Sequence, residues 1–156
     1  MTPSERLARL LALLVPAALL AGAWIGQLFF HLYPCEMCHW QRWPHYAAVV
    51  LAGLAFVVPQ RSVAKSLIIV AALLIAISGA IGVFHAGVEW HWWNGFTACT
   101  GSLGSGGSTL DRIMNTAVIP CDVAQWRFLG ISLAGYNALI SLAGAALILG
   151  MMRKAR

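Results

Sequence analysis

The sequence predicts an all-α membrane protein, a bundle of four transmembrane helices with a long outer loop that carries a short interfacial helix. Three observations predict this fold class. Hydrophobic residues make up 60% of the 156 residues and charged residues only 10%, against roughly 25% charged residues in ordinary globular domains. The apolar residues fall into four long runs, which polar segments separate. Most of the basic residues fall in segments that would share one side of a membrane.

The four runs define the expected spans of a single membrane domain. They cover residues 10–30, 43–58, 67–88 and 128–152. The first run has Gln27 as its one polar residue, and at 1.5 Å per residue it can cross a hydrocarbon core of about 30 Å. Because Ala21-Gly22-Ala23 resembles a small-residue cleavage site, a cleaved signal peptide is the alternative interpretation of this run.

The segments between the spans predict the orientation. Residues 31–42 and 89–127 would lie on one side, and residues 59–66 would lie with both termini on the other. The second side carries seven of the ten basic residues, and cytoplasmic segments are rich in Lys and Arg. Both termini are therefore expected in the cytoplasm and all four cysteines on the outer side of the membrane, where disulfides persist. The basic residues form no dense cluster, so nucleic acid is not an expected partner.

The long segment 89–127 carries two further predictions. Its apolar residues at 110, 113, 114, 117 and 118 have helical spacing, so a short helix at 109–118 is expected to lie flat on the membrane. The Gly/Ser stretch at 100–108 before it is typical of a flexible linker. This stretch either lets Cys99 and Cys121 move relative to the bundle or serves only as a passive connection.

The chemistry centres on Cys35 and Cys38, which have the C-x-x-C spacing. This spacing suits a dithiol that cycles with a disulfide. With His39 it also reads as C-x-x-C-H, the attachment motif of a c-type haem. Cys99 and Cys121 form a second pair, either as a structural disulfide or as a partner in thiol–disulfide exchange with the first pair.

The second helix is expected to begin near Cys38, where the N-terminus of a helix stabilises a thiolate. Arg42 follows one turn later on the same face. Its charge would support the thiolate or hold a polar ligand beside it. The alternative is that Arg42 only anchors the helix at the membrane interface.

These motifs together resemble the DsbB family of disulfide-bond formation proteins in bacterial inner membranes, over nearly the whole chain. The resemblance rests on Pro34-Cys35-x-x-Cys38, Gln41-Arg42, Gly87-Val88-Glu89-Trp90, Cys99, Cys121-Asp122, Trp126-x-Phe128-Leu129-Gly130 and Gly135-Tyr136-Asn137. It implies four helices, a bound ubiquinone or menaquinone, and a periplasmic thioredoxin-like partner of the DsbA type. The implied activity is that of a protein-disulfide:quinone oxidoreductase.

The resemblance also implies a role for each site residue. Cys99 would exchange with the cysteine of the partner, and Cys121 would complete the loop disulfide. Cys35 would receive electrons from the loop pair, and Cys38 would form the thiolate that faces the quinone. Arg42 would lie beside a quinone oxygen.

Quinone reduction consumes two protons, and His39, His91 and Glu89 are possible relays. Each could instead be an interfacial polar residue without that role. Three rival interpretations of the whole chain remain open: a membrane-anchored c-type cytochrome, a zinc site built from the four cysteines, and a membrane protein with two structural disulfides. Because Cys99 and Cys121 lack zinc-module spacing, no metal is expected.

Overall fold

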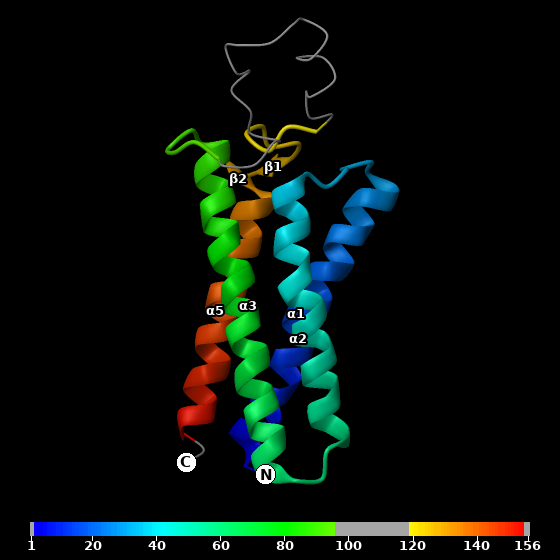
Figure 1. Cartoon of the computed structure of the whole chain (residues 1–156), viewed down its shortest axis with the longest axis vertical. Coiled ribbons are helices and arrows are strands. Elements are labelled where there is room, and N and C mark those ends of the chain that lie inside the picture. The colour runs from blue at the N-terminus through cyan, green and yellow to red at the C-terminus, as the bar shows by residue number, and fades with distance from the viewer. Residues whose placement is uncertain (1, 96–118, 155–156) are drawn as a thin grey trace, which may run out of the picture.

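The computed structural model describes residues 2–95 and 119–154. This part of the chain is mostly helical, with four long helices: α1 (Pro3–Phe29), α2 (Glu36–Val57), α3 (Arg61–Glu89) and α5 (Leu133–Lys154). The helices run side by side along the long axis, and both termini lie at the same end of the bundle (Figure 1). The expected interfacial helix at 109–118 lies outside the described residues.

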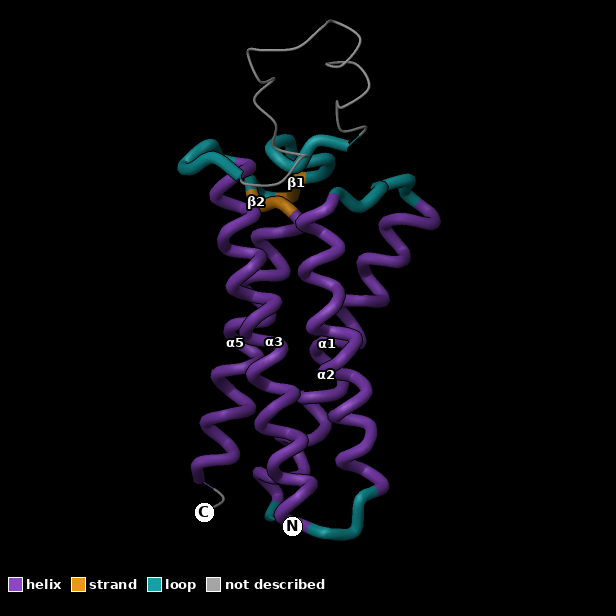
Figure 2. Tube along the Cα trace, in the orientation of Figure 1, coloured by secondary structure: helices purple, strands orange, loops and turns teal. Residues whose placement is uncertain are grey.

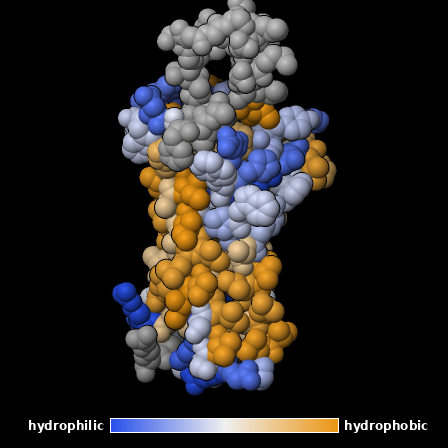
Figure 3. All heavy atoms as spheres, in the orientation of Figure 1, coloured by the Kyte–Doolittle hydropathy of each residue, from blue (hydrophilic) through white to orange (hydrophobic). Residues whose placement is uncertain are grey.

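Three of the helices, α1, α3 and α5, are long and apolar enough to cross a membrane. The helix α2 has 22 residues, but polar side chains including Gln41 and Arg42 interrupt its first half. A hydrophobic surface covers the middle of the bundle on the face shown in Figure 3, and hydrophilic residues lie towards both ends. The chain is therefore a membrane protein by the length and composition of its helices.

Small residues allow the helices to pack closely. In a membrane, helix association depends on close van der Waals contact, which small side chains permit. Every helix has buried alanines: Ala8 and Ala12 in α1, Ala48, Ala52 and Ala55 in α2, Ala64, Ala71 and Ala72 in α3, and Ala134, Ala138 and Ala145 in α5. At Gly82 of α3, a Cβ would lie 3.0 Å from backbone atoms of both Ala134 and Ala138, so only glycine permits this approach to α5.

The helix α2 begins at Glu36, where Cys35 caps it, close to the predicted start near Cys38 and before the apolar run from residue 43. The helix α5 begins at Leu133, five residues after the start of the fourth apolar run at residue 128. Strands β1 (Arg127–Phe128) and β2 (Ile131–Ser132) pair there in a small antiparallel hairpin (Figure 2). Its two-residue turn, Leu129 and Gly130, has positive φ at both positions, which is typical of the tight turns of hairpins.

The end of the bundle near the termini is held by a buried carboxylate. Glu5 is 1% exposed and forms ion pairs with Arg61 at 2.8 Å and Lys65 at 2.7 Å. It also completes a capping box with Thr2 at the start of α1. These contacts join the start of α1 to the start of α3. The segments that carry Cys35, just before α2, and Cys121, between α3 and β1, lie at the opposite end of the bundle (Figure 1).

Candidate functional site

The start of α2 positions the first two cysteines. The sulfur of Cys35 caps the helix by accepting a hydrogen bond from the Cys38 backbone N–H at 3.3 Å. The two sulfur atoms lie 2.8 Å apart in a thiol hydrogen bond, and both cysteines are free. Cys35 is 5% exposed. The pKa of the Cys35 thiol is raised, first because it keeps its proton in the hydrogen bond to Cys38 and then because it is buried. Cys38 is therefore the thiolate of the pair.

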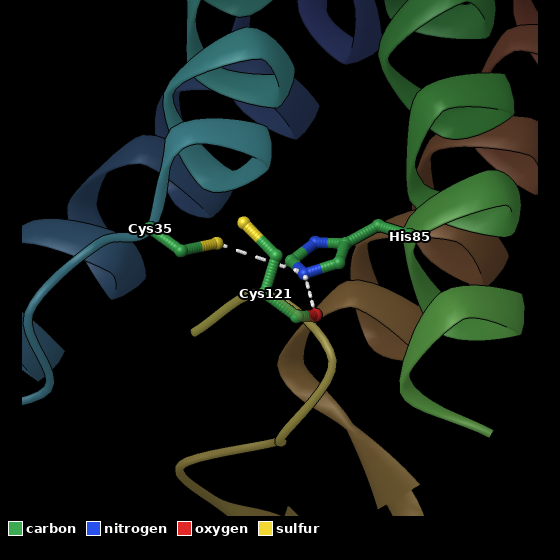
Figure 4. A group of neighbouring side chains, drawn as sticks. All are labelled: Cys35, His85 and Cys121. Carbon is green, nitrogen blue, oxygen red and sulfur yellow. Dashed lines mark hydrogen bonds between the residues drawn. The ribbon is translucent and has the colours of Figure 1, made fainter. Parts of the chain in front are cut away.

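A third cysteine, Cys121, reaches the same place from the segment that follows α3. The Cys35 sulfur, a ring nitrogen of His85 and the Cys121 sulfur all lie within 4.8 Å of one another (Figure 4). Cys121 is 1% exposed, packs in one cluster with Met37 and Val88, and is disulfide-bonded. A disulfide sulfur is not a thiolate ligand, so Cys121 in this state offers no thiolate to a metal ion. Cys99 lies outside the described residues.

His85 is a site residue that the sequence analysis did not identify. Its Nε2 lies 3.6 Å from the Cys35 sulfur and 3.2 Å from the Cys121 carbonyl oxygen. Its Nδ1 lies 2.8 Å from Nε2 of Gln41, and the Gln41 Oε1 accepts a hydrogen bond from Asn137. The sequence does carry a signal for Gln41, His85 and Asn137. All three are polar residues within or at the edge of apolar runs, where polar residues are costly and often functional.

A cavity of about 270 Å³ opens beside the thiols, between α1, α2 and α5. In Figure 1, α1 leans away from the other helices towards its C-terminal end. The α1 wall of the cavity is formed by small and apolar residues, and the opposite side carries polar ones: Cys38, Gln41, Arg42, His45, His85, Glu89 and Asn137. An apolar space with a few convergent polar groups is typical of a small-molecule site.

Arg42 borders this cavity. Its guanidinium donates hydrogen bonds to the Gln27 side chain at 2.8 Å and to the Ala23 carbonyl at 3.3 Å. It also lies 5.6 Å from the ring of Trp24. Three residues of α1 thus hold the side chain of Arg42 in place. Gln27 is the single polar residue of the first apolar run, and its hydrogen bond to Arg42 explains why a polar residue lies there.

The three suggested proton relays differ in position. Glu89 is 7% exposed, borders the cavity and lies 3.8 Å from Nε2 of His85. His39 and His91 are exposed and do not border the cavity. Because a haem ligand at His39 would need its iron on that exposed face, away from the buried trio, the arrangement does not favour the cytochrome alternative.

The comparison with known families agrees with this geometry. The model of the family "Disulfide bond formation protein DsbB" matches residues 5–151. The chain belongs to the DsbB family. No curated protein and no solved structure gave a significant match. Membership in the DsbB family makes this chain a membrane oxidoreductase of disulfide-bond formation, which works with a disulfide donor and with quinones in general.

The residues around the cavity fit a quinone. A quinone is a flat apolar ring with two oxygen atoms that accept hydrogen bonds, and it requires an apolar space with donors at its edge. The α1 side of the cavity supplies the apolar surface, and Arg42 supplies several N–H donors in a planar fork. A bound quinone would accept two electrons. The thiol of Cys38 borders the same cavity.

Proposed function

We propose that the protein reoxidises a periplasmic thioredoxin-like disulfide donor of the DsbA type and passes the electrons through two cysteine pairs to a membrane quinone. The observation that carries this proposal is the contact of the two pairs. A disulfide-bonded Cys121 lies within 4.8 Å of the free thiol of Cys35, close enough for exchange after a small movement. The free thiol pair in turn borders a cavity that fits a quinone.

Cys121 is proposed to pair with Cys99. The chain has four cysteines, and Cys35 and Cys38 are free. The reduced partner gives two electrons and two protons to the Cys99–Cys121 disulfide and leaves as a disulfide. The resulting dithiol then reduces the Cys35–Cys38 disulfide through a mixed disulfide. When Cys35 and Cys38 are thiols and Cys121 is in a disulfide, the next proposed step is electron transfer from Cys35 and Cys38 to the quinone.

The last step uses the residues of the cavity. Cys38 provides the thiolate, and Arg42 holds a quinone oxygen by a charge-assisted hydrogen bond. Oxidation of the Cys38 thiolate and the Cys35 thiol to a disulfide releases two electrons and one proton. The electrons and this proton pass to the ring of ubiquinone or menaquinone, and the second proton of the quinol is taken up from water. Glu89 is proposed as a proton relay because it is buried beside His85; His39 and His91 are too exposed to be favoured.

The site is proposed to lie on the periplasmic side of a bacterial inner membrane, with four spans and both termini in the cytoplasm. The placement of both termini at the end opposite the cysteines supports this orientation (Figure 1). The basic residues of that end support it as well: Arg6, Arg9, Arg61, Lys65, Arg153, Lys154 and Arg156.

A stoichiometric assay tests the function. Purified protein is mixed with a quinone and a reduced thioredoxin-like protein, and quinone loss is followed by absorbance. We expect one quinone lost per partner disulfide formed. In Cys121→Ser, which lacks the resolving thiol, we expect a trapped mixed disulfide between Cys99 and the partner. Quinone loss without partner oxidation, or trapping on Cys38 alone, would contradict the proposed electron path.

A further inference from the structure

The two cysteines for which exchange is proposed lie on segments without secondary structure of their own. Residues 119–126, all within the described part of the chain, carry Cys121 and form no helix or strand, and residues 31–35, which carry Cys35, are equally irregular. In Figure 4 the two cysteine side chains come from these separate segments and point toward each other. Because neither segment has the regular backbone bonds of a helix or strand, other contacts have to hold the two sulfur atoms within 4.8 Å.

Two contacts fasten the segment that carries Cys121 to α3. The Nε2 atom of His85 lies 3.2 Å from the Cys121 carbonyl oxygen. Just after the segment, the guanidinium of Arg127 donates a hydrogen bond to the backbone oxygen of Glu89 at 3.4 Å. His85 and Glu89 both belong to α3. A direct link to residues 31–35 comes from a different side chain.

The side chain of Gln125 supplies this link. Its Nε2 atom donates a hydrogen bond to the backbone oxygen of Tyr33 at 2.6 Å. A carbonyl oxygen only accepts hydrogen bonds, so the amide nitrogen of Gln125 must face it. Tyr33 is two residues before Cys35 and Gln125 is four residues after Cys121, so little chain separates the bond from the two sulfur atoms. The ring of Pro34, which fixes its own φ, stiffens that short connection further.

We propose that Gln125 is a positioning residue, which holds Cys121 beside Cys35 for exchange between the two cysteine pairs. This inference rests on the proposed function. In the exchange, the Cys121 thiolate attacks the Cys35 sulfur, the Cys35–Cys38 bond breaks, and its electron pair leaves on Cys38. The Cys99 thiolate then attacks Cys121, and Cys35 leaves with the electron pair of the mixed disulfide. Both steps require the Cys121 and Cys35 sulfur atoms to meet, and the bond from Gln125 favours that approach.

The effective concentration of the two thiols toward each other tests this role without a partner or a quinone. Full-length protein with Cys38→Ser and Cys99→Ser keeps only Cys35 and Cys121, and it is equilibrated anaerobically in detergent with reduced and oxidised glutathione. Each protein disulfide that is reduced converts two glutathione thiols to one glutathione disulfide. Acid quenching, alkylation and mass measurement give the disulfide fraction. In Gln125→Leu, which keeps the bulk but not the donor, we expect the effective concentration to fall about two- to fivefold, the effect of one exposed hydrogen bond.

Gln60→Leu is the matched control in the same background. Gln60 is also an exposed glutamine, makes no side-chain hydrogen bond at the start of α3, and lies at the end of the bundle opposite the cysteines (Figure 1), so we expect no change. Gln125→Lys, whose ammonium group can donate to the Tyr33 oxygen, should keep most of the effective concentration.

Three results would overturn the inference alone: no fall in Gln125→Leu, an equal fall in Gln60→Leu, or an equal fall in Gln125→Lys. The last two would show a general disturbance of the protein rather than the loss of one donor. Failure of Cys35 and Cys121 to form a disulfide with Gln125 intact would overturn the proposed electron path as well.

Discussion

The Nε2 atom of His85 lies 3.6 Å from the sulfur of Cys35 and 3.2 Å from the backbone oxygen of Cys121. Its proton is on Nε2, because Nδ1 accepts from the amide nitrogen of Gln41. The orientation of that amide is fixed in turn, since its oxygen accepts from Asn137. One N–H therefore faces Cys35 and Cys121, the two cysteines for which exchange is proposed. A donor in this position stabilises negative charge on the Cys35 sulfur when that sulfur leaves or attacks.

We expect His85→Phe to slow exchange between the two cysteine pairs by about three- to tenfold, less than the full effect of a charged hydrogen bond because the distance is long. Single-turnover exchange is followed by acid quenching, alkylation and mass measurement. His39→Phe is the control, since His39 is exposed on the same helix turn as the thiols. An equal effect of the two substitutions would show that His85 acts only through packing.

The Cys35 and Cys38 thiols should differ in their pH dependence. The pKa of Cys35 is raised by its hydrogen bond to Cys38 and by burial, so Cys35 stays protonated at pH values at which an ordinary thiol ionises. At neutral pH we expect iodoacetamide to label Cys38 first, and Cys35 to react only under more alkaline conditions. Mass spectrometry of reduced protein across a pH series measures both rates.

Cys38→Ser provides the control for this assignment. It removes the thiolate that is the main cause of the raised pKa, so labelling of Cys35 should move to lower pH. If labelling of Cys35 keeps the same pH dependence in Cys38→Ser, burial rather than the thiol pair controls it.

The sequence predicted the helical fold and the DsbB family, because both leave local signals. Apolar runs predict spans, and the C-x-x-C spacing predicts a dithiol. It placed Arg42 near the Cys38 thiol but did not predict a hydrogen-bonded network beside the thiols. Gln41, His85 and Asn137 lie on three helices and meet only through packing, at hydrogen-bond distances of 2.8 Å.

The apolar runs do not mark the first residues of α2 and α5, for a different reason. Local side-chain chemistry decides each helix start, and hydropathy does not report it. A cysteine sulfur caps α2 eight residues before its apolar run begins at residue 43. At α5, Gly130 with φ of 80° permits a tight turn, so the apolar residues from Phe128 to Ser132 form a hairpin instead of helix.

Sidedness can be tested with a thiol reagent that does not cross membranes. The proposed orientation puts the cysteines on the periplasmic side, opposite both termini. In reduced spheroplasts of the inner membrane, we expect labelling of Cys38 from outside without permeabilisation. A cysteine introduced at exposed Arg61 should be labelled only after permeabilisation. The reverse pattern would invert the orientation and remove access to a periplasmic partner.

The buried Glu5 should matter for stability and not for chemistry. Its carboxylate accepts from Arg61, Lys65 and the Thr2 backbone, and it lies at the end of the bundle opposite the cysteines. We expect Glu5→Gln to lower the thermal midpoint in detergent, because two basic side chains lose their anion, while exchange rates stay unchanged. Glu36→Gln, also in the first turn of a helix but exposed, is the matched control. Equal midpoints for the two variants would contradict a structural role for the ion pairs.

Arg42 and Gln27 should act as one unit in quinone use. Arg42→Ala removes a charge-assisted hydrogen bond of about 1.5–3 kcal/mol, which corresponds to roughly a ten- to hundredfold rise in apparent quinone KM. Arg42→Lys keeps the charge but not the planar fork, so its rise should be smaller. Gln27→Leu leaves the guanidinium in place but removes its 2.8 Å contact to α1, and we expect a rise of a few-fold.

A double-mutant cycle separates positioning from direct contact. If Gln27 acts only by holding Arg42, Gln27→Leu should have no further effect in the Arg42→Ala background. Single-turnover oxidation of the partner by the loop pair should survive all of these changes, because Arg42 borders the cavity and makes no contact with Cys121. Additive effects of the two substitutions would show that Gln27 contacts the quinone itself. An unchanged quinone KM in Arg42→Ala would make Arg42 an interfacial anchor and would place the quinone elsewhere.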